Sequence, residues 1–160
     1  RQMCIRDRPT LAMEAKESIY GEETDEDTIE TFMRILDKKI HEAKDMLIER
    51  FERICSQNPD SAKFMYENNL MAGYDGKDIR SALKHGTLAL GQLGLAETLQ
   101  ILIGCDHTEK KGMELAKKIE ELFKTKCAEF KEKYKLNFGV YFTPEVSVGA
   151  CTVMYNEKIA

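Results

Sequence analysis

The stretch from His85 to Gly104 carries almost no charge, in a chain of which 32% of the residues are charged. Glu97 is its one acidic residue, three glycines fall in its first half, and a helix-like Leu-Ala-Glu-Thr-Leu pattern fills its second half. A surface helix would keep a polar face, so this stretch is expected to be buried on most sides. It is long enough to span a bilayer, but its glycines would break the helix early. We therefore predict a buried core element of a soluble protein.

The composition indicates about one domain with a core of its own, since 42% of the 160 residues are hydrophobic. A net charge of −4 gives no reason to expect nucleic acid or an anionic membrane as a direct partner. The five cysteines are widely spaced and form no Cys-x-x-Cys pair, and no stretch resembles a signal peptide. These features favour a reducing cytoplasm over a disulfide framework, and their spacing with the histidines predicts no zinc site.

Two long segments space their apolar residues by three and four, as amphipathic helices do. The first runs from Ile29 to Cys55 and should end before Pro59, with Thr24 as a candidate N-cap. The second, Met113–Tyr134, follows residues 105–108, which offer capping side chains. Between them the sequence predicts less regular structure: a short helix over 61–69, a turn at 73–76 and a brief helix over 78–84.

A strand is predicted over Asn137–Thr143, where aromatic and β-branched residues dominate and Pro144 ends the run. A long helix that leads into an apolar strand indicates an α/β unit whose strand is buried in a larger sheet or barrel. A single strand cannot form a sheet by itself. The chain is therefore expected to be a fragment of a larger protein.

The two ends look unlike the rest of the chain. Residues 1–8 (RQMCIRDR) show neither helical nor strand periodicity and resemble a translated sequencing adapter, so we interpret them as non-native. Pro9–Lys16 is interpreted as the tail of a strand that enters a helix or loop. The residues between these ends, 9–144, are assigned to part of one domain. Residues 145–160 show no clear period, and a frame-shift or a chimeric join would explain them.

General catalytic motifs are missing. The glycines between His85 and Gly94 do not fit G-x-G-x-x-G, no P-loop lysine follows them, and there is no serine-centred elbow. Motifs of this kind would not by themselves identify an enzyme.

Three segments resemble the anaerobic, class III ribonucleoside-triphosphate reductases, in the order of that family. KHGTLALGQLGLAETLQILIG (Lys84–Gly104) resembles its HG-x-L-x-x-G-x-x-GL-x-E-x-L segment. EKYKLNFGVYFTP (Glu132–Pro144) is similar to its EKY-x-(L/Y)-x-F-x-x-Y-x-TP strand, and PTLAMEAK (Pro9–Lys16) to the end of its NLPRLAIEAK segment. The joint match is far more specific than any one segment.

This resemblance implies a fragment of the ten-stranded α/β barrel of a glycyl-radical enzyme, made mostly of long helices with at least one core strand. The family reduces ribonucleoside triphosphates to deoxyribonucleotides under anaerobic conditions, commonly with formate. Its glycyl radical generates a cysteine thiyl, and a separate activating enzyme with a 4Fe–4S cluster and S-adenosylmethionine installs the radical. The parent is also expected to be a homodimer with structural zinc and with ATP and deoxynucleotide effectors. The fragment is expected to hold none of these groups and to be inactive by itself, because none of its cysteines matches the catalytic position.

Candidate site residues follow from the same motifs. Tyr141 occupies the position of the family's active-site tyrosine before Thr-Pro, although a buried strand aromatic is the alternative interpretation. Glu145 is a weaker catalytic candidate, since it stands one position earlier than the family's glutamate and would face the other side of a strand. His85 and Gly86 are candidates for substrate contact or for a structural turn. Glu97 matches a family glutamate and is expected to need a buried partner.

Two other interpretations stay open. A non-catalytic helical interaction module would use its two long helices to bind a partner, but it would have little use for an aromatic strand that ends in Thr-Pro. A different glycyl-radical enzyme, related to the formate lyases, fits the Lys84–Gly104 segment less well.

Overall fold

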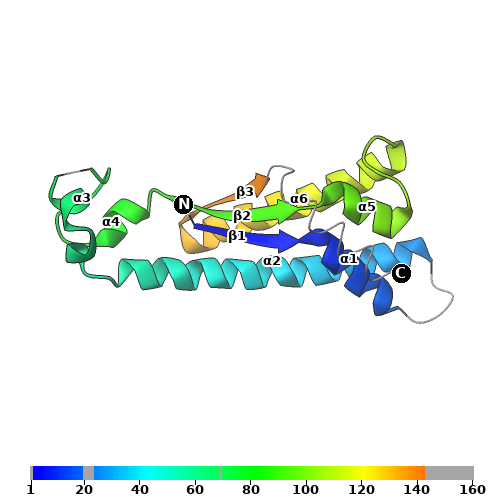
Figure 1. The fold of residues 1–160 in the computed structure, drawn as a ribbon, viewed down its shortest axis with the longest axis horizontal. Coiled ribbons are helices and arrows are strands. Elements are labelled where there is room, and N and C mark those ends of the chain that lie inside the picture. Colours follow the sequence, from blue (N-terminus) through cyan, green and yellow to red (C-terminus); the bar gives the residue numbers. More distant parts are fainter. Residues whose placement is uncertain (1, 20–23, 69, 143–160) are drawn as a thin grey trace.

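The computed structural model describes residues 2–19, 24–68 and 70–142 (Figure 1). Long helices run beside a small sheet, and shorter helices lie at both ends of it. In chain order the elements are β1 (Gln2–Asp7), α1 (Arg8–Glu17), α2 (Asp25–Cys55), the 3-10 helix η1 (Pro59–Ala62), α3 (Lys63–Glu67), α4 (Ile79–Leu83), β2 (Thr87–Leu93), α5 (Leu95–Ile103), α6 (Lys110–Tyr134) and β3 (Asn137–Phe142).

The sheet has three parallel strands in the order β1-β2-β3, so their order in space follows their order in the chain. Thr87 of β2 pairs with Asn137 of β3 near the start of both strands. Further along, Gly91 of β2 lies between Ile5 of β1 and Tyr141 of β3. The α/β class predicted from the sequence is confirmed, whereas closure into a barrel stays a prediction.

The core lies between one face of the sheet and the apolar stripes of α2 and α6, and both predicted long helices are confirmed. Their inward residues recur every three or four positions, which places them on one side of each helix. Met113 was predicted on this stripe but is largely exposed. The buried hydrophobic residues on α2 are Phe32, Leu36, Ile40, Ala43, Leu47, Phe51 and Cys55, and those on α6 are Leu115, Ala116, Ile119, Phe123, Cys127 and Phe130.

The two long helices begin differently. Thr24 caps α2 as predicted: its side-chain oxygen accepts from the backbone N–H of Asp27, whose carboxylate accepts from the Thr24 backbone N–H at 3.1 Å. The prediction that residues 105–108 cap α6 is wrong. Asp106 accepts instead from the Thr108 N–H, and Glu109, the N-cap of α6, makes no side-chain capping bond.

Two strands were not predicted from the sequence. The first half of the His85–Gly104 stretch was expected to belong to a buried core element interrupted by its glycines, and within it Thr87–Leu93 forms the central strand. This strand is buried through Leu88–Gln92 and therefore lacks the alternation that marks a half-buried strand. The helical pattern in the second half of the stretch is confirmed by α5.

The other strand lies in residues 1–8, which show no strand periodicity and were interpreted as non-native. Gln2–Asp7 pairs with β2 along its whole length. Backbone pairing to an available strand edge does not require side-chain periodicity, so the sequence pattern could not reveal it. The sheet accordingly contains three strands where the sequence indicated one. Whether this segment is native stays a prediction.

The connection from α2 to β2 contains only short helices, as predicted. Gly73 and Gly76 take positive φ angles of 80° and 83° in the predicted turn. The side chains of Phe64 and Leu70 are 72% and 58% exposed. Within the described residues, no helix combines the length and the apolar character that a membrane span would require.

Candidate functional site

The two faces of the sheet differ in what covers them. On β2, Leu88 and Leu90 belong to the core cluster formed with α2 and α6. Gln92 follows on the same side and donates from Nε2 to Oε2 of Glu120 on α6 at 2.7 Å. Successive side chains of a strand alternate, so Ala89 and Gly91 point to the opposite side. We call that side the second face.

Tyr141 lies on the second face. Its neighbours in β3, Phe138 and Val140, contribute to the core, Phe138 being buried there. Tyr141 is offset from both by an odd number of residues and therefore points away from the helices. The Tyr141 side chain is half-buried, and its register partner is Gly91. Gly91 and Gly139, its neighbours on this face, carry no side chains.

The structure does not bring His85 and Gly86 close to Tyr141. Both precede Thr87, at the N-terminal end of β2, and both are exposed. The strand positions of Thr87 and Gly91 are separated by about 13 Å at the usual rise of a parallel strand. The His85 ring lies against Gly73 of the preceding turn. The remaining candidate, Glu145, lies outside the described residues.

A buried polar cluster lies at the C-terminal end of β2, and sequence reasoning missed it. Arg8 is 2% exposed. Its Nε donates to the carbonyl of Leu93 at 3.0 Å, and its Nη1 donates to Gln92 Oε1 at 2.7 Å and to Glu120 Oε1 at 2.8 Å. A signal was present, since Gln92 is a polar residue within an apolar run. Its partner Arg8 was overlooked because residues 1–8 were excluded from the fold.

The charge of this cluster is balanced locally. Burial lowers the pKa of Arg8, while the carboxylates of Glu120 and Glu97 act in the opposite direction. A guanidinium nonetheless stays charged at any physiological pH. Glu97 is half-buried and lies close enough to Arg8 for its charge to act on the guanidinium.

Gly94 joins β2 to α5 next to this cluster. Its φ is +68°, and a Cβ at this position would lie 2.4 Å from Cγ of Pro9. Only glycine combines that backbone conformation with so close a contact. Gly94 therefore allows Pro9 to pack closely against the start of α5.

The described residues contain no group of three or more His, Cys, Asp or Glu side chains that could hold a metal ion. Of the cysteines, Cys55, Cys105 and Cys127 are buried free thiols. Burial raises the pKa of Cys127 to about 11, so this thiol stays protonated at neutral pH. These residues do not fit the zinc site that the family resemblance implies for the parent, and no role in the present site is derived from zinc.

Comparison with known proteins agrees with the motifs in the sequence. The family model for anaerobic ribonucleoside-triphosphate reductase matches residues 9–156. The match begins at Pro9, directly after the adapter-like segment, and continues beyond Pro144, where the motifs end. A search of curated proteins finds no significant match. Because the family model covers most of the sequence, the chain belongs to the anaerobic ribonucleoside-triphosphate reductase family.

Proposed function

We propose that the chain forms adjacent strands and crossover helices in the α/β barrel of an anaerobic ribonucleoside-triphosphate reductase. Two observations support this. The strands follow one another in chain order, whereas a doubly wound sheet reverses its order at a switch point. Both long crossover helices also pack on one face of the sheet, as they do in the wall of a barrel.

The second face would then form part of the barrel interior. Parallel sheets are almost always covered on both faces, so a face outside the helical core is expected to meet another part of the same protein. Ala89, Gly91 and Gly139 place little side-chain bulk on this face, although Ala89 itself is buried. A substrate could approach the strands there, beside Tyr141.

The position of Tyr141 on the second face is the single observation that carries the proposed function. In the complete enzyme, the glycyl radical that the family resemblance implies would supply the radical chemistry at the ribose. Tyr141 contributes a phenol that can both donate and accept a hydrogen bond. We infer that it orients the ribose or a neighbouring group. Such positioning increases the reaction rate, because small displacements of a reacting group slow the reaction strongly.

Other parts of the family's function are proposed with it. The substrate is a ribonucleoside triphosphate, the radical is installed by a radical-SAM activating enzyme in the cytoplasm, and the complete protein is a homodimer under nucleotide control. The isolated chain is proposed to be inactive, since Cys55 and Cys127 lie in the helical core, away from Tyr141. For His85 and Gly86, the contact with Gly73 favours a structural turn over substrate contact.

The test replaces Tyr141 with Phe in a complete reductase that carries this sequence. Loss of one hydrogen bond made in the transition state should lower kcat by about tenfold or more. The matched control is Tyr134→Phe, which removes a hydroxyl on the helix side that accepts from Lys44 Nζ at 3.2 Å. Turnover should survive that change. Equal turnover of Tyr141→Phe and the unmodified enzyme would remove Tyr141 from the site.

The helical interaction module receives no support from the structure. Such a module would consist of two long helices and would not require a strand. In the structure, however, β3 pairs with β2 along Asn137–Phe142, and Phe138 belongs to the same core cluster as residues of both long helices.

A further inference from the structure

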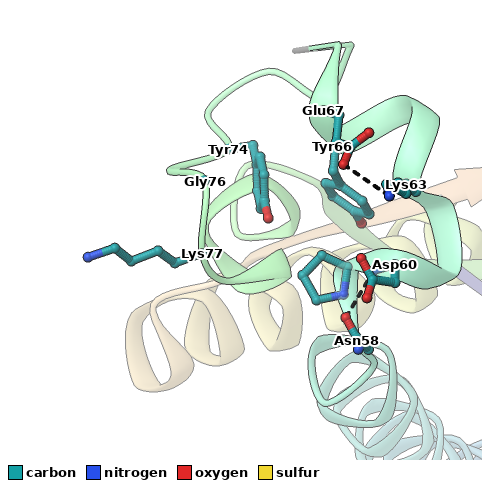
Figure 2. A pocket seen from close by; sticks show the side chains of 9 residues that line it. Asn58, Asp60, Lys63, Tyr66, Glu67, Tyr74, Gly76 and Lys77 are labelled. Carbon is teal, nitrogen blue, oxygen red and sulfur yellow. Dashed lines mark hydrogen bonds and ion pairs between the residues drawn. The ribbon is translucent and has the colours of Figure 1, made fainter.

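A polar pocket lies beyond the C-terminal end of α2, at the opposite end of the molecule from α1 and α5 (Figure 1). Its volume is about 430 Å³. It is formed where η1 and α3 meet the turn at 73–77, and the side chains around it include Asp60, Lys63, Tyr66, Glu67 and Tyr74, with Lys77 at its edge (Figure 2). Neither the family motifs nor the proposed active-site face includes these residues.

Two tyrosines provide the aromatic wall of the pocket. Tyr66 is 9% exposed and Tyr74 is half-buried. Their ring centroids are 4.7 Å apart, with the rings tilted by 51°. This contact leaves no slot in which a third ring could be sandwiched, so the pair is not built to enclose a nucleobase. The faces of phenol rings are negative, however, and attract cations.

The charged side chains around the wall make the pocket favourable for a cation. Lys63 is already engaged, since its Nζ lies 3.6 Å from Oε1 of Glu67. Lys77 extends away from the pocket (Figure 2). Asp60 donates its backbone N–H to Asn58 Oδ1 at 3.0 Å, but within the described part of the chain its carboxylate has no ion-pair partner.

The titration of Tyr74 agrees with this description. Partial desolvation raises its pKa, and the carboxylates of Asp75 and Asp60 raise it further. A negative field that disfavours the phenolate favours a cation at the same place.

We propose that this pocket binds a guanidinium group, with its charge beside Asp60 and its plane against the rings of Tyr66 and Tyr74. An arginine side chain and a free small guanidinium compound present the same chemistry. An anion is disfavoured because the two lysines of the lining are paired or directed outward. The site lies at the N-terminal end of the strands, remote from Tyr141, and does not depend on the proposed catalytic function.

The proposal is tested on the 160-residue chain by following the ring resonances of Tyr66 and Tyr74 by NMR. Titration with N-acetyl-arginine amide should shift both rings saturably, whereas the neutral citrulline analogue should not. A peptide with a central arginine is compared with guanidinium chloride at matched ionic strength. Tighter binding of the peptide identifies a side chain as the ligand, and equal binding identifies a free cation. Equal shifts with citrulline, or larger shifts with inorganic phosphate, would overturn the proposal.

Variants separate the charge from the aromatic wall. Asp60→Asn should weaken binding of the arginine probe at least tenfold, and Tyr74→Leu should weaken it similarly, while Tyr74→Phe keeps the ring and the affinity. Lys77→Gln is the matched control and should bind as well as the unmodified chain. Asp60 is exposed, so its replacement leaves the fold intact even if Tyr74→Leu does not. Unchanged affinity in Asp60→Asn would contradict the assignment.

Discussion

Two connections join neighbouring strands of the sheet, β1 to β2 and β2 to β3, and both contain a short helix followed by a long one. Each begins at the C-terminal end of its strand with a short helix, α1 after β1 and α5 after β2. Each then returns along the sheet in a long helix, α2 or α6, whose apolar stripe completes the core (Figure 1). The covering of the sheet is thus produced twice by the same amphipathic pattern.

The connections differ in how they end. After α6, Lys135 takes a left-handed conformation with φ of 54°, and β3 begins at Asn137. After α2, the chain passes through residues 56–86 before β2 begins. This excursion buries few side chains: η1 buries none, α3 only Tyr66, and α4 only Ile79 and Ala82. We infer that the direct return is constrained by the core, whereas the excursion is free to form a binding pocket.

The largest effects should come from truncating the core in both connections. Phe32 on α2 is 0% exposed and Phe123 on α6 is 1% exposed. Replacing either with Ala should lower the free energy of unfolding by about 3–5 kcal/mol, because a large side chain is lost and a cavity remains. Phe64→Ala, in the excursion, should change it by about 0.5 kcal/mol or less. Urea denaturation of the three variants measures the difference.

Comparable losses for Phe64→Ala and Phe32→Ala would show that the excursion belongs to the cooperative core. The contrast between the two connections would then fail.

A smaller effect is expected at alkaline pH from the buried thiol of α6. The pKa of Cys127 is raised from 9.0 to about 11 by burial. The folded state therefore holds its proton more tightly than the unfolded state does, and this contribution is complete below pH 9 and lost as the pH rises towards 11. It amounts to about 2 kcal/mol.

The measurement compares the free energy of unfolding of the chain and of Cys127→Ala between pH 8 and pH 11. The loss of stability over this range should be shallower in the variant. Cys55, at the end of α2 beside the excursion, serves as the control: burial also raises its pKa, but Arg80 acts against it. If Cys55→Ala reduced the pH dependence of the free energy of unfolding more than Cys127→Ala does, the conclusion that burial raises the pKa of Cys127 more than that of Cys55 would be wrong.

The sequence predicts the helices well because their stripes are recorded in local spacing. The spacing of Leu36, Ile40 and Ala43 identifies the inward side of α2 without any knowledge of the residues that pack against it. Strand β2 could not be found in this way, since burial through Leu88–Gln92 removes the alternation and the glycines in and beside the strand, Gly86, Gly91 and Gly94, are typical of turns. Strand β1 can be recognised only once its partner β2 is known, because the backbone pairing between them does not depend on a side-chain pattern within β1.

The candidate site shows the same division. Tyr141 is identified through its motif. Its place opposite Gly91 depends on the pairing register of β2 and β3, and the sequence alone does not reveal that register. Arg8 lies 84 positions from Gln92 and 112 from Glu120, so no local pattern links the three. Tyr66 and Tyr74 likewise form a pair only because the excursion folds back on itself.

The smallest effects should come from the first turns of α2 and α6. Thr24→Ala removes the side-chain cap of α2 and should lower the free energy of unfolding by about 1 kcal/mol. Glu109→Ser provides α6 with the cap it lacks and should raise it by about 0.5 kcal/mol or more. Urea midpoints of the two variants should therefore move in opposite directions. If Glu109→Ser destabilised the chain, the Glu109 side chain would have a role at the start of α6 other than capping.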